Sequence, residues 1–422
     1  MASVAASSGI PEVHLLDRYE PLIGVRRTER LVKKARALGD LRVLHINSTR
    51  NGGGVAEILS SLVPLMNAVG IASDWHVIDG PPEFFGFTKE IHNALHGEAV
   101  DLTDQKASLH REVVLDDAVR AALDYDVVIV HDAQPLPLIE MRQRQAWIWC
   151  CHVDLSAPDP DIWDYVAPIA NLYDAAVFSL PEYAQELSIP QHFIKPAIDP
   201  FSPINQQLFR SQTIERLRQY HIPVDLPLVI QAGRFDKWKD PQGVVDAFCT
   251  ASDQVAATLV LVGNTATDDP EGPAMFEAIC ASSGERIIVL SVDDPLLVNA
   301  LQRRAAVVLQ KSLREGFGLT VSEAMLKGKP VIGGNVGGIR HQVKEGQTGF
   351  LVDDVPQAAA RIEELLSDAP LRRNMGRRAK ERARKHFLMT RLMEDWLDLI
   401  AALTRRDRAR VPHRQLTESS SS

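Results

Sequence analysis

The chain has few cysteines and no long apolar stretch, and both absences narrow its class. It contains four cysteines and no CxxC pair among them: Cys150, Cys151, Cys249 and Cys280. Such cysteines are expected to be buried free thiols of a reducing compartment. No apolar run approaches the roughly 20 residues that cross a bilayer, and the N-terminus has no basic segment followed by an apolar one. The sequence therefore predicts a cytoplasmic protein without a membrane partner.

The chain also lacks a surplus of positive charge and the fingerprint of dinucleotide binding. Lys and Arg number 46 against 55 Asp and Glu, a net charge of −9, which argues against nucleic acid as a partner. The basic segment Leu371–Phe387 has the spacing of a helix with a solvated face. Glu57 stands where GxGxxG would need its third glycine, which counts against an NAD-dependent oxidoreductase. No metal-ligand cluster is evident, so no metal site is predicted.

What the sequence does contain is an alternation of short apolar runs with helical patterns. Uninterrupted runs rich in Val and Ile are typical of parallel strands covered by helices on both faces. Between them apolar residues recur at steps of three and four, as in the helix expected from Val55 to Val69. This alternation predicts a doubly wound α/β fold. The expected strands are residues 41–47, 126–132, 147–153, 175–180, 226–234, 257–264, 286–292, 305–312, 330–334 and 348–352.

The length and a break in this alternation predict two domains. A chain of 422 residues exceeds what one hydrophobic core usually supports. Residues 201–225 contain no strand-like run and follow two prolines, so the linker is placed near 197–208. The expected division is an N-terminal domain at 1–200 with a leading helix over 20–37, a C-terminal domain at 201–385, a helix at 386–410 that packs back on the N-terminal domain, and a disordered tail at 411–422.

Ligands of open parallel sheets bind at the carboxyl ends of the strands, and two candidate segments end strands of the first half. Gly52–Gly54 precede a helix whose free N–H groups can face a phosphate, although a plain strand-to-helix turn explains them equally well. His152 ends the strand at 147–153 and is followed by Asp154. A histidine at this place suits either a structural or a catalytic role.

Two further segments end strands of the second half. Arg234 and Lys239 share one loop, where a guanidinium fork and an ammonium can converge on a diphosphate. The alternative is a surface loop with incidental charges. Glu315 and Glu323 frame a GFG turn at a strand-to-helix junction, where carboxylates can each accept from vicinal hydroxyls. The glycines of that turn allow a ligand close to the backbone and to the helix N-terminus.

Together these segments resemble the retaining glycosyltransferases of family four, which share the GT-B fold. The most specific features are the E-x7-E pair, Glu315 and Glu323, and the Arg…Lys pair, Arg234 and Lys239. The likeness covers about residues 40–405 and is greatest to the trehalose-forming branch, through HINSTRNGGGVAEIL, CCHVDLSAP, GRFDKWKDP and the segment His76–Gly97. One departure from most of the family is Asp in place of Gly after the lysine. The resemblance implies an enzyme with two Rossmann-like domains that face a central cleft.

The resemblance also implies roles for individual residues. Arg234 and Lys239 would hold the donor diphosphate, Glu323 the ribose and Glu315 the transferred glucose. His152 would contact the donor sugar near the reacting carbon. The backbone that lines the donor would come from Gly53, Gly54, Gly316, Phe317, Gly318 and Leu319. By likeness alone, the acceptor side would include Asp79, Lys89 and Asp154.

The implied activity is retaining transfer of glucose from a nucleotide diphosphate-glucose to free glucose, forming trehalose. Three alternatives stay open: a retaining trehalose phosphorylase that uses glucose 1-phosphate, another family-four sugar transferase, and a binding module without activity. No cofactor is required, and Mg²⁺ beside the donor diphosphate is left open. The nucleotide base and a homodimeric state are also left open.

Overall fold

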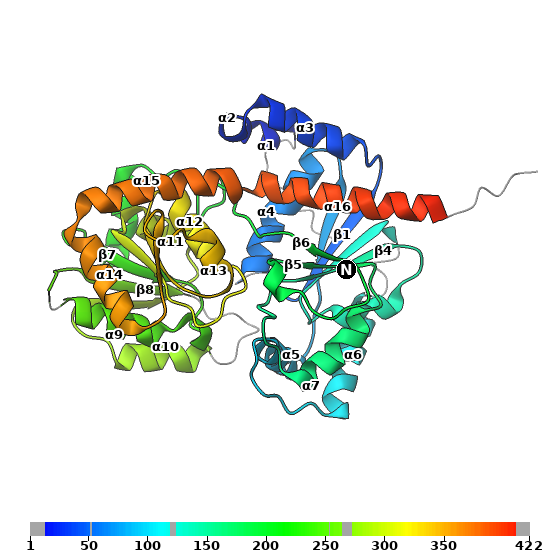
Figure 1. Cartoon of the computed structure of the whole chain (residues 1–422), viewed down its shortest axis with the longest axis horizontal. Coiled ribbons are helices and arrows are strands. Elements are labelled where there is room, and N and C mark those ends of the chain that lie inside the picture. The colour runs from blue at the N-terminus through cyan, green and yellow to red at the C-terminus, as the bar shows by residue number, and fades with distance from the viewer. Residues whose placement is uncertain (1–12, 51–52, 119–123, 253, 264–271, 411–422) are drawn as a thin grey trace, which may run out of the picture.

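The computed structural model describes residues 13–50, 53–118, 124–252, 254–263 and 272–410 (Figure 1). They form two α/β domains, each built on a six-stranded sheet in which every strand pair is parallel. Gly52 and the expected tail at 411–422 lie outside the described residues. No helix within the described part of the chain is long and apolar enough to cross a membrane.

The first sheet has the order β2-β1-β3-β4-β5-β6. Its central strands are apolar on both faces: every residue of β3 and β4 is buried, because helices cover both sides. An apolar core lies on each face of this sheet, and the sheet separates the two cores. The strands are β1 (Arg42–Asn47), β2 (Ala72–Val77), β3 (Val127–His131), β4 (Ala146–Cys151), β5 (Ala175–Phe178) and β6 (Gln191–Phe193). The helices are α1 (Val13–Asp17), α2 (Glu20–Ile23), α3 (Val25–Arg36), α4 (Gly54–Ala68), α5 (Pro82–Leu95), α6 (Asp104–Ala118) and α7 (Pro160–Ala170).

The second sheet has the order β12-β11-β10-β7-β8-β9, and its inner strands are again buried on both faces. Its strands are β7 (Leu228–Ala232), β8 (Thr258–Gly263), β9 (Ile287–Ser291), β10 (Val307–Gln310), β11 (Val331–Gly334) and β12 (Gly349–Val352). The helices are α8 (Arg210–Gln219), α9 (Pro241–Ser252), α10 (Gly272–Ala281), α11 (Pro295–Arg304), α12 (Leu319–Leu326), α13 (Gly337–Gln342), α14 (Val355–Ser367), α15 (Ala369–His386) and α16 (Met389–Arg410). Short 3-10 turns include η2 (Leu136–Met141), η3 (Pro181–Tyr183) and η4 (Lys237–Lys239).

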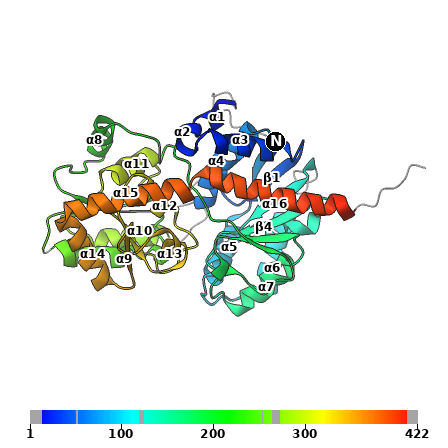
Figure 2. The same cartoon turned by 45° about the horizontal axis from the view of Figure 1, so that its top comes forward.

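The chain passes between the domains twice, and the two passages lie side by side. The Ile198 N–H donates to the Phe387 carbonyl at 2.9 Å, and the Met389 N–H donates to the Ile198 carbonyl at 3.0 Å. After the second passage α16 runs along the first domain, as both views show (Figures 1 and 2). Its apolar residues, among them Trp396, join the core formed by β1, α3 and α4. The last helix therefore ties the end of the chain to its beginning.

The strands expected from apolar runs are present, each within a few residues of its expected bounds. Three expectations were wrong in detail. The helix expected over residues 20–37 is broken at Gly24, whose φ of +82° lies in the left-handed region, so α2 and α3 are separate. Strands β2 and β6 were not expected. Two of the four free cysteines, Cys249 and Cys280, are exposed rather than buried.

Candidate functional site

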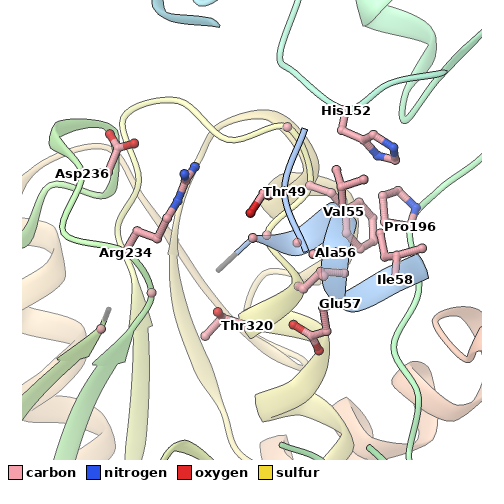
Figure 3. A pocket seen from close by; sticks show the side chains of 18 of the residues that line it. Thr49, Val55, Ala56, Glu57, Ile58, His152, Pro196, Arg234, Asp236 and Thr320 are labelled. Carbon is pink, nitrogen blue, oxygen red and sulfur yellow. The ribbon is translucent and has the colours of Figure 1, made fainter. Parts of the chain in front are cut away.

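A pocket of about 580 Å³ lies between the two domains, at the carboxyl ends of both sheets. This volume is within the range of sites for ligands of cofactor size. In Figure 3, Arg234 and Asp236 lie on one side of the pocket and His152 on the other, with the start of α4 between them. Among the residues singled out from the sequence, the lining includes Gly53, Gly54, Lys89, His152, Arg234, Lys239, Glu315, Gly316, Phe317, Gly318, Leu319 and Glu323.

The loop after β7 carries the two expected cations into this pocket. Arg234 follows Gly233 directly after the strand, and Lys239 ends the turn η4. The Asp236 side chain starts that turn by accepting from the Trp238 N–H at 2.8 Å. Burial would raise the pKa of the Asp236 carboxyl, but Lys89, the Trp238 N–H, Arg234 and Lys239 together hold it below its usual value. The loop is thus an ordered turn that places the positive charges of Arg234 and Lys239 at the pocket.

The Glu315 carboxylate is held by one of its two oxygens. Its Oε2 pairs with the Lys239 ammonium and also accepts from Gln310 Nε2 and Ser312 Oγ, each at 3.2 Å. All three bonds from described side chains fall on Oε2, which leaves Oε1 to accept a hydroxyl of a ligand. Lys239 and Glu315 are therefore in direct contact, which the separate sequence expectations for them did not include.

Glu323 faces a second carboxyl from the other domain. It lies on α12, is 2% exposed, and accepts from Gln302 Nε2 at 2.9 Å. Glu57, in the first turn of α4, shares a hydrogen bond with it. Burial raises the pKa of Glu57 well above its usual value, and the charge of Glu323 and the hydrogen bond to it raise it further. The raised pKa favours the protonated form of Glu57, and a proton between the two carboxyl groups would let them meet across the domain interface.

The GFG turn brings the second domain against His152. A Cβ placed on Gly316 would lie 1.9 Å from the His152 carbonyl oxygen, so only glycine fits at this contact. Gly318 has a φ of +84° and precedes α12, where a side chain would be strained. Tyr183 of the first domain donates to the Glu315 carbonyl at 3.0 Å. The GFG turn and the end of β4 are thus fitted together through their backbones.

The residue after β3 is a partly buried acid that sequence patterns did not single out. Asp132 lines the pocket and has a φ of +62°, which is strained for a residue with a side chain. Its Oδ1 accepts from the His152 N–H at 2.7 Å. Burial raises its pKa, and His152 partly opposes that rise. Its place at a strand end, directly after His131, is the signal that could have identified it.

Helix α5 forms one wall of the pocket and contacts the η4 turn of the other domain. Lys89 pairs with Asp236 at 3.4 Å, and both side chains are less than a tenth exposed. The ring of His96 stacks on Trp238 with centroids 5.6 Å apart. Burial first, and then His96 and the nearby cations, lower the pKa of His92 well below its usual value, so this imidazole is neutral. Helical spacing placed these side chains on one face, but the sequence alone pointed only to Lys89.

Two of the residues expected on the acceptor side are not brought into the lining. Asp79 is exposed and accepts from the Gly80 N–H at 2.9 Å. Asp154 is buried and accepts from the Ser156 N–H at 2.9 Å, which forms a local turn. Neither residue borders the pocket.

One group of described side chains has a spacing that could hold a metal ion. The donor atoms of His131, Cys150 and His152 all lie within 4.8 Å of one another. The sequence expectation of no metal site did not foresee this group, because the three residues meet through neighbouring strands rather than through a sequence motif.

Comparison with known families matches both halves of the chain. The family described as "Trehalose synthase, N-terminal domain" matches residues 45–185, and "Glycosyl transferases group 1" matches residues 213–382. Trehalose synthase of Pyrococcus horikoshii is 41% identical over 399 residues, covering 92% of this chain and 96% of that protein. Trehalose synthase of Rubrobacter xylanophilus is also 41% identical, over 91% of this chain and 96% of its own length.

There are also more distant sequence relatives and solved structures of similar fold. Trehalose phosphorylase of Pleurotus pulmonarius is 26% identical, over 86% of this chain but 58% of its own length. Among solved structures, sucrose-phosphate synthase of Thermosynechococcus elongatus has a TM-score of 0.68 at 19% identity, covering 86% of this chain and all of that one. A protein of Anabaena in complex with UDP-glucose has a TM-score of 0.66 at 17% identity, with 86% and 100% covered. The two domains are thus those of the GT-B fold, as expected from the sequence.

Proposed function

This chain belongs to the trehalose synthase family and is a GT-B glycosyltransferase, and we propose that it transfers glucose from a nucleotide diphosphate-glucose to free glucose, forming trehalose. The observation that carries the proposal is the convergence of Arg234, Lys239, Glu315 and Glu323 on one pocket between the domains. A nucleotide sugar needs cations for its diphosphate and carboxylates for its hydroxyls, and both are present here.

The donor is proposed to lie against the second domain. Arg234 and Lys239 hold the diphosphate and stabilise the negative charge that develops on the leaving group. Glu315 accepts a hydroxyl of the transferred glucose on its Oε1, and Glu323 accepts from the ribose. The N-terminus of α12, which begins at Leu319, adds the positive end of a helix dipole.

The acceptor glucose is proposed to lie against the first domain, between α5 and the end of β3. Lys89 and His92 face the pocket from α5, His96 from the residue that follows this helix, and Asp132 from the residue that follows β3. This set replaces Asp79 and Asp154 as the proposed acceptor contacts. A sugar placed here is surrounded by both domains, which keeps water from competing for the donor.

The proposed chemistry is transfer with retention at the anomeric carbon. The bond between C1 and the diphosphate oxygen breaks, and a hydroxyl of the acceptor forms its bond to C1 on the same face. The acceptor proton passes to the departing diphosphate oxygen. The side chains stabilise charge and orient the two sugars, and no carboxylate serves as a nucleophile.

A donor panel tests the proposal against the phosphorylase alternative, which the distant fungal phosphorylases keep in view. ADP-, UDP-, GDP- and TDP-glucose and glucose 1-phosphate are each incubated with free glucose, and trehalose is measured by chromatography. We expect trehalose from at least one nucleotide-glucose. Trehalose from glucose 1-phosphate alone would show that the enzyme is a phosphorylase and would contradict a nucleotide diphosphate-glucose as the donor.

A further inference from the structure

Three histidines on neighbouring strands form a chain that leads from the core of the first domain to the pocket. Nδ1 of His45, on β1, lies 3.0 Å from Nε2 of His131, on β3. Nδ1 of His131 lies 2.9 Å from Nε2 of His152, which follows β4. The successive rings stack with centroids 5.4 and 5.2 Å apart. His45 and His131 are buried, and His131 and His152 both border the pocket.

Burial favours the neutral form, with one proton, for each of the three rings. Burial lowers the pKa of His45 to about 3. Burial, together with the two neighbouring histidines, lowers the pKa of His131 well below its usual value. Each contact between two neutral rings joins one N–H to one bare nitrogen. The geometry therefore permits two arrangements: all three rings protonated on Nδ1, or all three on Nε2.

His45, at the buried end of the three histidines, distinguishes the two arrangements. Nε2 of His45 is buried and has no hydrogen-bond partner in the described structure. If the rings were protonated on Nε2, this nitrogen would be a buried N–H with no acceptor, which folded proteins rarely contain. If they are protonated on Nδ1, it is a bare nitrogen, and every N–H inside the chain has an acceptor. The second arrangement avoids burying an unsatisfied donor.

The Cys150 thiol is a further neighbour of His152, with Sγ 3.4 Å from Nε2. A bare Nε2 has one lone pair, which already accepts from His131 Nδ1–H, so this contact does not distinguish the two arrangements. With the proton on Nδ1, the remaining N–H of His152 has no partner among the described residues.

We propose that His45 and His131 are positioning residues that fix His152 as its Nδ1–H tautomer, so that it presents an N–H donor to an oxygen of the sugar in the pocket. The inference deepens the proposed function, because the sugar is its assumed ligand. In this tautomer His152 donates a hydrogen bond and does not act as a base toward the sugar through Nδ1.

Nitrogen NMR reads the tautomer directly and needs no turnover. The full chain is labelled with ¹⁵N-histidine, and long-range ¹H–¹⁵N spectra are assigned with His45→Asn, His131→Asn and His152→Asn. We expect His45, His131 and His152 to be neutral, with the proton on Nδ1. A proton on Nε2 of His152, or a charged His152 ring at neutral pH, would overturn the proposal even if trehalose synthesis were confirmed.

A matched pair of variants tests the positioning role. His45→Asn keeps an N–H near the place of Nδ1, whereas His45→Leu keeps the bulk without a donor. We expect His45→Asn to retain the Nδ1–H signal of His152 and nearly all of kcat. We expect His45→Leu to give mixed tautomers and to lower kcat roughly two- to tenfold, the worth of one hydrogen bond. Equal losses in both variants would assign His45 to packing alone.

Metal analysis distinguishes the hydrogen-bonded chain from a metal site at the same atoms. The purified protein is measured for bound zinc by mass spectrometry, beside Cys150→Ser. We expect no stoichiometric zinc in either protein. One zinc per protein molecule that is lost in Cys150→Ser would overturn the proposal, because the metal would then occupy the nitrogens of His131 and His152.

Discussion

Individual side chains in the pocket are held by partners that a bound donor would exchange for its own groups. Lys239 contacts Glu315 directly, and Arg234 lies on the same loop. We expect Arg234→Ala to lower kcat about 10²- to 10³-fold, as the loss of one charge-stabilising donor does in other enzymes. Arg234→Lys keeps the charge but loses the planar guanidinium fork, so its kcat is expected to lie between those of the wild type and Arg234→Ala. Initial rates and thermal unfolding are measured together. Wild-type rates in Arg234→Ala would remove its role at the diphosphate.

The raised pKa of Glu57 predicts a specific dependence of stability on pH. Its pKa is raised on folding, so the folded chain binds a proton that the unfolded chain has lost above the usual value near 4.5. Stability associated with this group therefore falls as pH rises from that value toward the raised one. Glu57→Gln keeps the shape and needs no proton. We expect its urea midpoint to exceed that of wild type at pH 8 and the difference to shrink toward pH 4. A constant difference would contradict the assignment of the proton.

At this scale the sequence predicted residues that belong to local motifs and missed those that meet through tertiary structure. Arg234 and Glu323 could be found because strand-end loops and helix starts bring such side chains to one edge of a sheet. Asp132 was missed because nothing near it in sequence marks it, and its significance comes from its φ and its bond to His152. Asp79 was suggested by likeness alone and lies outside the pocket lining.

Among the elements, the turn before α12 is the one whose shape the site most requires. Gly316→Ala would place a methyl group against the His152 carbonyl, so the turn or the end of β4 must shift. We expect kcat/KM to fall at least about tenfold, because small misplacements of reacting groups are costly. Gly284→Ala is the matched control, since a Cβ there meets nothing within 4 Å. Similar kinetics in the two variants would contradict the close fit.

Secondary structure was predictable where strands are continuous apolar runs, including β9 and β12 at the edges of the second sheet, and two strands were missed at the edges of the first sheet. β3 and β4 are buried on both faces, so their sequences are continuous apolar runs. β2 and β6 are the two edge strands of the same sheet, and several of their residues are polar and partly exposed. These two edge strands carry apolar residues on fewer sides, so their pattern resembles a loop.

Over the whole molecule, the last helix links the stability of the first domain to the end of the chain. Trp396 on α16 is 2% exposed and packs edge-on against the rings of His45 and His131. We expect Trp396→Ala to lower the free energy of unfolding by about 3–5 kcal/mol. Asp398→Ala, on the exposed face of the same helix, is expected to cost less than about 1 kcal/mol. Urea unfolding measures both. Equal small losses would mean that the first domain does not depend on α16.

The two-domain architecture was predictable from length and repeated alternation, whereas the individual contacts between the domains were not. Contacts such as Lys89 with Asp236 and Tyr183 with the Glu315 carbonyl join residues more than 100 positions apart. No sequence pattern encodes such pairs, because they depend on how one domain is placed on the other. Each domain supplies part of the lining, so domain placement decides whether the site is complete.

The most direct test of the account follows one labelled carbon through the transfer. The enzyme is mixed with nucleotide diphosphate-[1-¹³C]glucose, using the nucleotide that supports turnover, and with unlabelled glucose, and the anomeric signals are followed by NMR. Retaining transfer to glucose predicts that the donor signal is replaced by a single α-linked signal of trehalose as the nucleoside diphosphate is released. Label that appears in free glucose, or in a β-linked product, would contradict retaining transfer to glucose.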